Sequence, residues 1–159
     1  MKVIIVTGTP GTGKTTLSKK ISKKLNFQYL DVNDVIQSNP NLITGFDKKR
    51  DSKIIDEKKL ANTLAKLIKS NKRNLIIDSH LSHYINKKLV SLCIVTRCSD
   101  LKKLKERLKK RKYKKEKIKE NMEAEIFDVC LIEAMQYQEN ILVVDTCKRL
   151  SYKEINERL

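Results

Sequence analysis

A glycine-rich stretch near the start of the sequence carries the residue types that bind phosphate. Residues 8–15 read GTPGTGKT and fit the pattern G-x-x-x-x-G-K-[ST] without a mismatch. Glycines let backbone N–H groups turn inward around an anion, because no Cβ stands in the way. In this pattern Lys14 would bridge the β- and γ-phosphates of a nucleotide, and the hydroxyl of Thr15 would bind Mg²⁺. The stretch therefore predicts a nucleotide site.

The segments on either side of this loop match the context that the motif needs. An apolar run, residues 3–6, precedes it and predicts a strand. Leu17, Ile21 and Leu25 follow at helical spacing, and a helix beginning near Thr12 would direct its positive end at the same anion. A glycine turn of purely structural use is the alternative. The succession of strand, loop and helix favours the phosphate site.

Two polar residues follow a second apolar strand and predict the rest of a reaction centre. Ligands of open parallel sheets bind beyond the carboxyl ends of the strands. Asp78 ends the run Leu75-Ile76-Ile77, so its carboxylate could hold the Mg²⁺ shell through water. His80 lies two residues further on and could orient a water molecule or polarise a phosphate oxygen. The alternative for His80 is a surface histidine without a role.

Two arginines stand out in a segment that is otherwise rich in lysine. Arg107 and Arg111 are four residues apart, which places them on one side of a helix. Guanidinium groups suit a transferring phosphoryl group better than ammonium groups do. The apolar period breaks at residues 111–113, which predicts a mobile lid that excludes water. Alternatively, both arginines belong to a solvated face.

The elements that must position these residues alternate along the whole chain. Strands are expected at residues 2–7, 28–31, 74–78, 89–96 and 141–145. Helices are expected at 12–25 and 33–38, after Asp56, after Ser99 or Asp100, in one long helix through 118–129, and after Ser151. Residues 39–52 are expected to be irregular, with Gly45 in a turn. The pattern predicts one α/β domain over residues 1–159, a five-stranded parallel sheet with helices on both faces.

Composition narrows the class of protein. A hydrophobic content of 40% and a charged content of 34% indicate a folded, soluble chain. No stretch resembles a membrane span or a signal peptide, so we expect a cytoplasmic protein without membrane partners. The four cysteines form no C-x-x-C pair, which favours reduced, mostly buried thiols over a zinc or disulfide framework.

The positive charge is concentrated in one segment. The chain has a formal net charge of +16, and residues 102–119 hold twelve Lys or Arg against two Glu. Such a segment attracts polyanions, either nucleotide phosphates or RNA. The alternative is a solvated, lysine-rich helix surface.

Several motifs together resemble one known family. They are the loop 8–16, Asp78-Ser79-His80, the run 96–100 (TRCSD), and the run 106–126 that contains ERLxxRxY and KIxENxxAEI. The ensemble resembles the nuclear-type adenylate kinases, the adenylate kinase isoenzyme 6 family. The resemblance implies a P-loop NTPase with an adenylate-kinase-like fold, a monophosphate-binding insert near 33–55 and a lid near 111–121. It also implies transfer of phosphoryl from ATP to AMP or another nucleoside monophosphate (NMP), ATP hydrolysis, and a role in small ribosomal subunit maturation through a platform ribosomal protein.

The resemblance also implies roles for individual residues. Catalysis falls on Lys14, Asp78, His80 and Arg111, and Mg²⁺ on Thr15 and Asp78. ATP contacts fall on Gly11, Gly13, Lys14, Thr15, Thr16 and Arg111, with Lys148 beside the adenine, and the monophosphate is assigned to Asp34, Lys49, Arg50 and Arg97. One departure stands out, because relatives tend to carry an arginine where this chain has Gln37. Lys48, Lys49 and Arg50 are the candidates to replace it.

Two other functions stay open at this point. One is an ATPase assembly factor whose basic lid region binds a ribosomal protein or rRNA, with little true kinase activity. The other is a small-metabolite kinase on the same scaffold, because a fold does not determine the acceptor.

Overall fold

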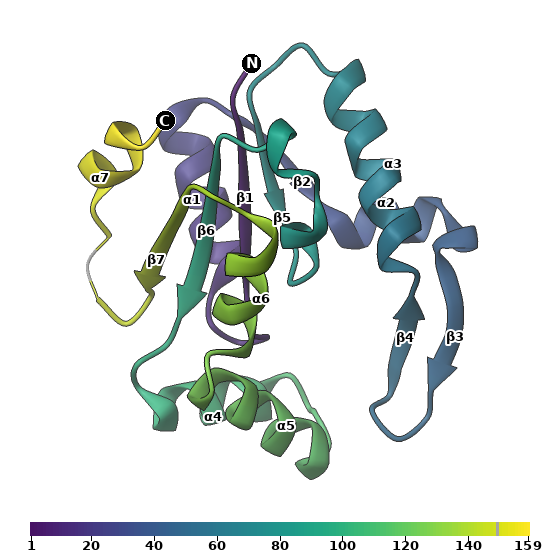
Figure 1. The fold of residues 1–159 in the computed structure, drawn as a ribbon. Coiled ribbons are helices and arrows are strands. Elements are labelled where there is room, and N and C mark those ends of the chain that lie inside the picture. Colours follow the sequence, from purple (N-terminus) through teal and green to yellow (C-terminus); the bar gives the residue numbers. More distant parts are fainter. Residues whose placement is uncertain (149) are drawn as a thin grey trace.

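A computed structural model describes residues 1–148 and 150–159 and shows a five-stranded sheet in the order β2-β5-β1-β6-β7 (Figure 1). All four pairings between neighbouring strands are parallel, so the predicted parallel sheet is confirmed. The strands are β1 (Val3–Gly8), β2 (Gln28–Asp31), β5 (Leu75–Asp78), β6 (Leu92–Arg97) and β7 (Ile141–Asp145). The fourth strand begins later than predicted, because Lys87–Leu89 forms a short 3₁₀ turn (η3).

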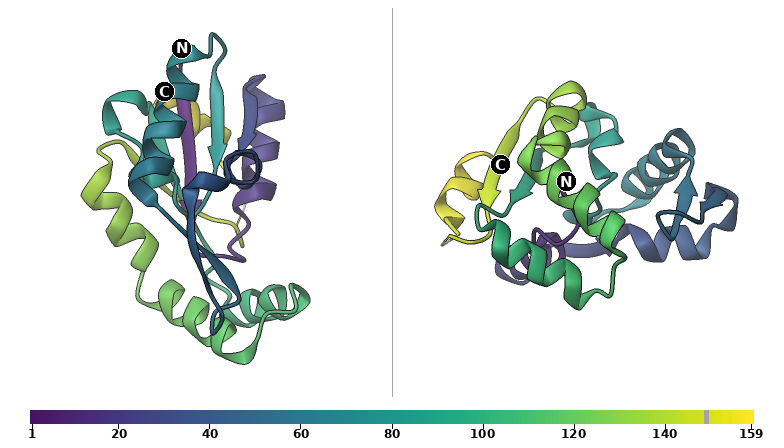
Figure 2. Two further views of the ribbon diagram at one scale, coloured as in Figure 1. Left: turned by 90° about the vertical axis from the view of Figure 1, so that its right-hand side faces the viewer. Right: turned by 90° about the horizontal axis from the view of Figure 1, so that it is seen from below.

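Helices cover both faces of the sheet, as the uninterrupted apolar strands require (Figure 2). On one face, Ile4 and Val6 of β1 pack against α1 (Lys14–Leu25) and α7 (Tyr152–Glu157). On the other face, Val3 and Ile5 pack against α3 (Glu57–Ser70) and α6 (Val129–Tyr137). The central strand β1 is therefore buried along its whole length and holds the loop that follows it in place.

The segment between β2 and α3 is more regular than expected. It contains α2 (Val32–Ser38), the 3₁₀ turn η1 (Pro40–Leu42), and an antiparallel hairpin of β3 (Ile43–Asp47) and β4 (Ser52–Ile55). The prediction of a turn at Gly45 was wrong, because Gly45 lies within β3, opposite Ile54. The turn lies at the tip instead, where Asp47 accepts the backbone N–H groups of Lys49 and Arg50. Most side chains of the hairpin are exposed or half-buried, so its strands lack the apolar run of a core strand.

The predicted long helix through residues 118–129 is divided in two. Figure 1 shows α4 (Leu101–Lys110) and α5 (Lys115–Ile126) beyond one end of the sheet, and α6 returning along its face. Asp128, between α5 and α6, has a positive φ of 53°, which interrupts the helical path. Its carboxylate pairs with Arg97 at 2.9 Å, so the bend lies beside the carboxyl end of β6. The remaining 3₁₀ turn, η2, spans Ser82–Tyr84.

Within the described residues, no helix combines the length and the apolar character that crossing a membrane would need.

Candidate active site

The glycine-rich loop joins the buried end of β1 to the first turn of α1, and hydrogen bonds of threonine side chains hold it in place. The hydroxyls of Thr12 and Thr96 lie 2.6 Å apart. Thr146 donates its hydroxyl to the carbonyl oxygen of Thr12 at 2.6 Å and would contact any Cβ placed on Gly13, whose φ is +93°. The loop is thus held by Thr96 near the end of β6 and by Thr146, which follows β7. This fixes the direction of its amides before a ligand arrives.

Lys14 lies across the mouth of this loop. Its Nζ donates to the carbonyl oxygens of Gly8 at 2.7 Å and Thr9 at 3.0 Å. Burial lowers the pKa of Lys14 to about 8, and the nearby carboxylate of Asp78 opposes part of that shift. The ammonium therefore carries its charge at neutral pH, next to the amides that would receive a phosphate.

Asp78 and Thr15 supply oxygen ligands on the same cavity wall. Asp78 ends β5 with a 4% exposed side chain, and its Oδ2 accepts a hydrogen bond from the hydroxyl of Tyr29 at 3.0 Å. Burial and the adjacent Asp78 raise the pKa of Tyr29 above its usual range, so this phenol remains a donor. A carboxylate and a hydroxyl form a set of hard oxygen donors that suits Mg²⁺. The sequence analysis missed Tyr29, because its contact with Asp78 joins two strands that are far apart in the chain.

His80 follows Asp78 into the same cavity. Its side chain is open to the cavity, yet the surrounding protein and the charge of Lys14 lower its pKa to about 4. The imidazole is therefore neutral near pH 7, donating a hydrogen bond from one ring nitrogen and accepting one at the other. His83 lies behind the loop, where its Nδ1 is 2.9 Å from the hydroxyl of Thr7.

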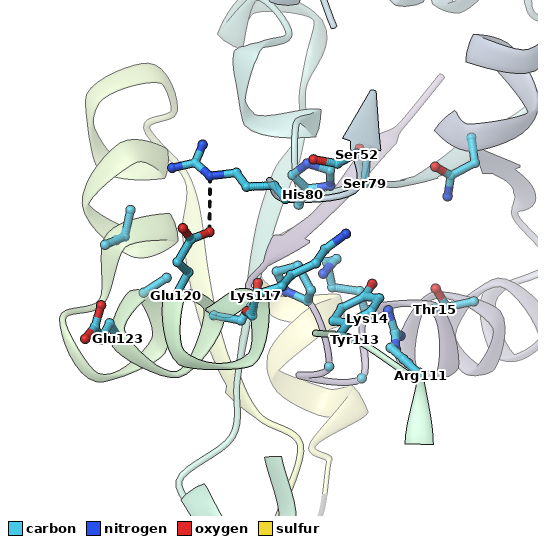
Figure 3. A pocket seen from close by; sticks show the side chains of 18 of the residues that line it. Lys14, Thr15, Ser52, Ser79, His80, Arg111, Tyr113, Lys117, Glu120 and Glu123 are labelled. Atoms are coloured by element: carbon cyan, nitrogen blue, oxygen red, sulfur yellow. Dashed lines mark hydrogen bonds and ion pairs between the residues drawn. The ribbon is translucent and has the colours of Figure 1, made fainter. Parts of the chain in front are cut away.

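Three cavities with shared walls lie at this end of the sheet, and the first two are lined by the loop. The first, about 710 Å³, is drawn in Figure 3 and has Lys14, Thr15, Asp78, His80 and Arg111 among its lining residues. The second, about 750 Å³, shares Gly11, Gly13 and Arg111 with the first. The third, about 510 Å³, shares Asn33, Arg50, Ser52, Ser79 and His80 with the first. The cavities therefore form a row from the β7–α7 loop, past the phosphate loop, to the hairpin.

Most of the residues assigned from the sequence line this row, and three do not. The first cavity takes Gly11, Gly13, Lys14, Thr15, Asp78, His80, Arg50 and Arg111, and the second takes Thr16 and Lys148. Asp34 and Lys49 are exposed and line none of the three cavities. Arg97 lines none of them either, because its guanidinium pairs with Asp128. Gln37, at the position of the expected arginine, does line the third cavity.

The hairpin and α5 meet across the first cavity. The guanidinium of Arg50, at the hairpin tip, pairs with Glu120 of α5 at 3.1 Å, the dashed contact in Figure 3. Both side chains are largely exposed, so the ion pair contributes little to stability. The ion pair holds the Arg50 guanidinium at the wall shared by the first and third cavities, where a phosphate bound in the third cavity would contact it. Glu120, Lys117 and Asn121 join the lining from within the predicted lid; they belong to the KIxENxxAEI motif, but the sequence assigned them no individual role.

Arg107 has a different role from the one expected for it. Its Nη1 donates to the carbonyl oxygen of Gly11 at 3.2 Å, and the side chain lines the second cavity. One of its donors therefore braces the phosphate loop, whereas Arg111 lines both the first and the second cavity.

Comparisons with known proteins find relatives along most of this chain. A family model described as an AAA domain matches residues 4–128. A "Putative adenylate kinase" of Pyrococcus furiosus is 40% identical over 158 residues, which cover 99% of this chain and 82% of that protein. An "Adenylate kinase isoenzyme 6 homolog" of Caenorhabditis elegans is 36% identical over 140 residues, which cover 87% and 76% of the two chains.

Solved structures show the same fold at low sequence identity. A deoxyadenosine kinase from M. mycoides with bound dATP matches with a TM-score of 0.60 and 18% identity, over 99% of this chain and 98% of that one. A shikimate kinase from Bacteroides thetaiotaomicron matches with a TM-score of 0.63 and 17% identity, over 99% and 93%. These neighbours support the fold alone.

Proposed function

This chain belongs to the family of the archaeal proteins named "Putative adenylate kinase" and of the adenylate kinase isoenzyme 6 homologs, and we propose on that premise that it transfers the γ-phosphoryl group of ATP to AMP or another NMP. The row of three cavities, with Lys14 lining the first of them, carries the proposal. ATP occupies the second cavity with its base and the first with its phosphates. The monophosphate occupies the third and directs its phosphate toward the first.

Catalysis in this proposal consists of positioning and electrostatic stabilisation. The loop amides and Lys14 hold the β- and γ-phosphates, and Arg111 reaches the transferring group from the lid side. Thr15 and Asp78 hold Mg²⁺, which neutralises phosphate charge when bound. His80 orients the acceptor oxygen, or a water molecule when no acceptor is bound. Water as the acceptor accounts for ATP hydrolysis on the same site.

A coupled assay tests the kinase proposal. ADP formation from ATP plus AMP is measured beside ADP formation from ATP alone, and the two-nucleotide rate is expected to exceed hydrolysis clearly. Other monophosphates and small hydroxyl metabolites are then offered in place of AMP to define the acceptor. If AMP adds no ADP beyond hydrolysis, the kinase proposal fails while the ATPase proposal stands.

Replacing Arg50 with alanine is expected to raise the KM for AMP about tenfold, with little change in the KM for ATP. We propose that Arg50 exchanges Glu120 for the monophosphate's phosphate and so replaces the arginine absent at Gln37. A charge-assisted hydrogen bond is worth about 1.5–3 kcal/mol, and about 1.4 kcal/mol corresponds to a tenfold change. Initial rates over a range of AMP concentrations provide the measurement.

The matched control is Lys49→Ala, next to Arg50 on the same hairpin tip. Lys49 carries the same charge but lines none of the three cavities, so its replacement is expected to leave the KM for AMP nearly unchanged. If the two replacements raised the KM for AMP equally, the positive charge of the hairpin tip as a whole would be responsible. A specific contact between Arg50 and the phosphate would then be ruled out.

The rate at low ATP is expected to fall as the pH rises above 8. The pKa of Lys14 in the free protein is lowered to about 8, so the ammonium that receives the phosphates loses its proton above that pH. Values of kcat/KM for ATP report groups of the free enzyme and should decrease about tenfold per pH unit beyond this point. The measurement is a pH profile at subsaturating ATP. A flat profile between pH 7 and 10 would contradict a role for the protonated Lys14.

A second function is favoured by the charge of the lid region. Of the twelve Lys and Arg of residues 102–119, all are exposed except Arg107 and Lys117, which are half-buried. We propose that this surface of α4 and α5 binds an anionic partner during small ribosomal subunit maturation in the cytoplasm, a platform ribosomal protein together with rRNA. Binding should weaken steeply with salt, and the partner should stimulate ATP hydrolysis. Pull-downs of small-subunit components with ATP at low and high salt test this, and salt-independent recovery or none at all would contradict it.

A further inference from the structure

Two of the four cysteines meet in the structure although 49 positions separate them in the chain. The Sγ atoms of Cys98 and Cys147 lie 2.9 Å apart, and both residues are free thiols. Cys98 follows β6 and Cys147 follows β7, and these strands are parallel neighbours whose carboxyl ends lie side by side. The spacing of the cysteines gave no sign of this contact, because it depends on the order of the strands.

The pair lies directly beside the second cavity. Thr146 and Lys148, which flank Cys147, both line that cavity. Nη1 of Arg107 lies 3.9 Å from the Sγ of Cys98. The same nitrogen donates a hydrogen bond to the carbonyl oxygen of Gly11 in the phosphate loop. A change in the position of the two sulfur atoms would therefore affect the residues that flank Cys147 and the hydrogen bond from Arg107 to Gly11.

The two thiols differ in access to solvent. Cys98 is 1% exposed, and burial together with the neighbouring Cys147 raises the pKa of its thiol to about 12. Cys147 is half-buried and is the sulfur that a reagent meets first. Cys93 is fully buried in β6, and Cys130 lies on α6 beside Thr9. A partly accessible thiol with a second thiol in contact is the arrangement of a redox-sensing pair.

We propose that Cys98 and Cys147 form a reversible disulfide that controls entry of the nucleotide base into the second cavity. The oxidant is a low-molecular-weight disulfide such as oxidised glutathione. The Cys147 thiolate attacks one of its sulfur atoms and displaces one glutathione thiolate, which takes up a proton. Cys98 then loses its proton, attacks the Sγ of Cys147 and displaces the second glutathione. Two protein thiols are oxidised by two electrons, and one glutathione disulfide becomes two glutathione thiols.

The effect on the nucleotide rests on the proposed function, whereas formation of the disulfide does not. A covalent bond draws the two sulfur atoms closer than their present contact and ties Cys147 to Cys98, and we expect the flanking Thr146 and Lys148 to narrow the cavity that they line. Binding of ATP and formation of the disulfide then disfavour each other. By linkage, the factor by which oxidation weakens ATP binding equals the factor by which ATP disfavours oxidation. We expect a factor of roughly five or more.

The test compares the full-length chain with two single variants in glutathione redox buffers. Cys147→Ser removes the pair, and Cys130→Ser is the matched control that keeps it. Mass spectrometry of the quenched proteins should show a loss of about 2 Da and a cross-linked peptide containing Cys98 and Cys147, in the parent chain and in Cys130→Ser only. Calorimetric titration with ATP should show weaker binding by the oxidised parent and no redox effect in Cys147→Ser. Reduction with dithiothreitol should restore the affinity.

Each result decides one part of the proposal. A glutathione adduct left on Cys147, a cross-link to another cysteine, or no oxidation would overturn the disulfide. A Cys98–Cys147 cross-link with unchanged ATP affinity would overturn its control of the cavity. If the reduced protein binds no ATP while the cross-link still forms, the proposed function has failed and the disulfide has not.

Discussion

Replacement of Lys14 by methionine is expected to reduce phosphoryl transfer about a thousandfold. Methionine has nearly the same length and keeps the apolar contacts of the side chain, but it removes the ammonium group. That ammonium lies against the Gly8 and Thr9 carbonyls and is the only charged side chain that we assign to both terminal phosphates of ATP. Its charge is needed most when negative charge moves between the phosphates, so the loss should appear in kcat as well as in KM.

The measurement is a steady-state rate with ATP and AMP at saturating concentrations of both, beside calorimetric titration with ATP. Lys23→Met on the exposed side of α1 is the control, because it removes the same charge from the same helix far from the cavities. Its rate should stay within about twofold of the parent, in line with the small effects of surface substitutions. A Lys14→Met protein that turns over ATP like the parent would refute the nucleotide site.

The second large effect concerns folding and is expected for Gly8→Ala. Gly8 ends β1 with φ +136°, a conformation that residues with a side chain rarely adopt. An added Cβ would also lie 2.5 Å from the backbone oxygen of Thr96 on the neighbouring strand β6. Backbone atoms of a central strand cannot yield as a flexible side chain can. We therefore expect a loss of about 3 kcal/mol or more in the free energy of unfolding.

Denaturant titration followed by circular dichroism measures this loss. Gly45→Ala is the matched control, because Gly45 has no positive φ and its added Cβ would meet only the Ile54 side chain at an ordinary 3.5 Å. That change should alter the free energy of unfolding by less than about 1 kcal/mol. Similar losses for the two variants would contradict the account of Gly8 as a position that only glycine can fill.

Sequence and tertiary structure contributed differently to the site. Asp78 and His80 could be placed from the sequence because they directly follow an apolar strand, and parallel strands bring their carboxyl ends to one edge of the sheet. Lys14 and Thr15 could be placed because the loop motif is a local one. Tyr29 could not, since its bond to Asp78 depends on β2 lying next to β5.

Two predictions of secondary structure were wrong, the irregular segment at residues 39–52 and the single long helix through 118–129, and the reasons are related. The hairpin was missed because β3 and β4 stabilise each other outside the core, and neither carries the apolar run of a buried strand. The long helix was predicted because the apolar period continues through residue 129, whereas the backbone of Asp128 adopts a positive φ and its carboxylate pairs with Arg97, 31 positions earlier in the chain. The hairpin pairs neighbouring segments, whereas Asp128 meets a distant one, and in both cases the tertiary context prevailed over the local pattern.

The sequence by itself determined the parallel sheet, the phosphate loop and the position of Asp78 and His80 at the end of a buried strand. All of these follow from patterns within about ten consecutive residues, where hydrophobic period and backbone freedom decide the structure. Only the tertiary structure decided that Arg50 faces Glu120, that Arg107 braces Gly11, and that Cys98 touches Cys147. Those contacts join segments whose distance in space is set by strand order and helix packing, and no local spacing encodes that distance.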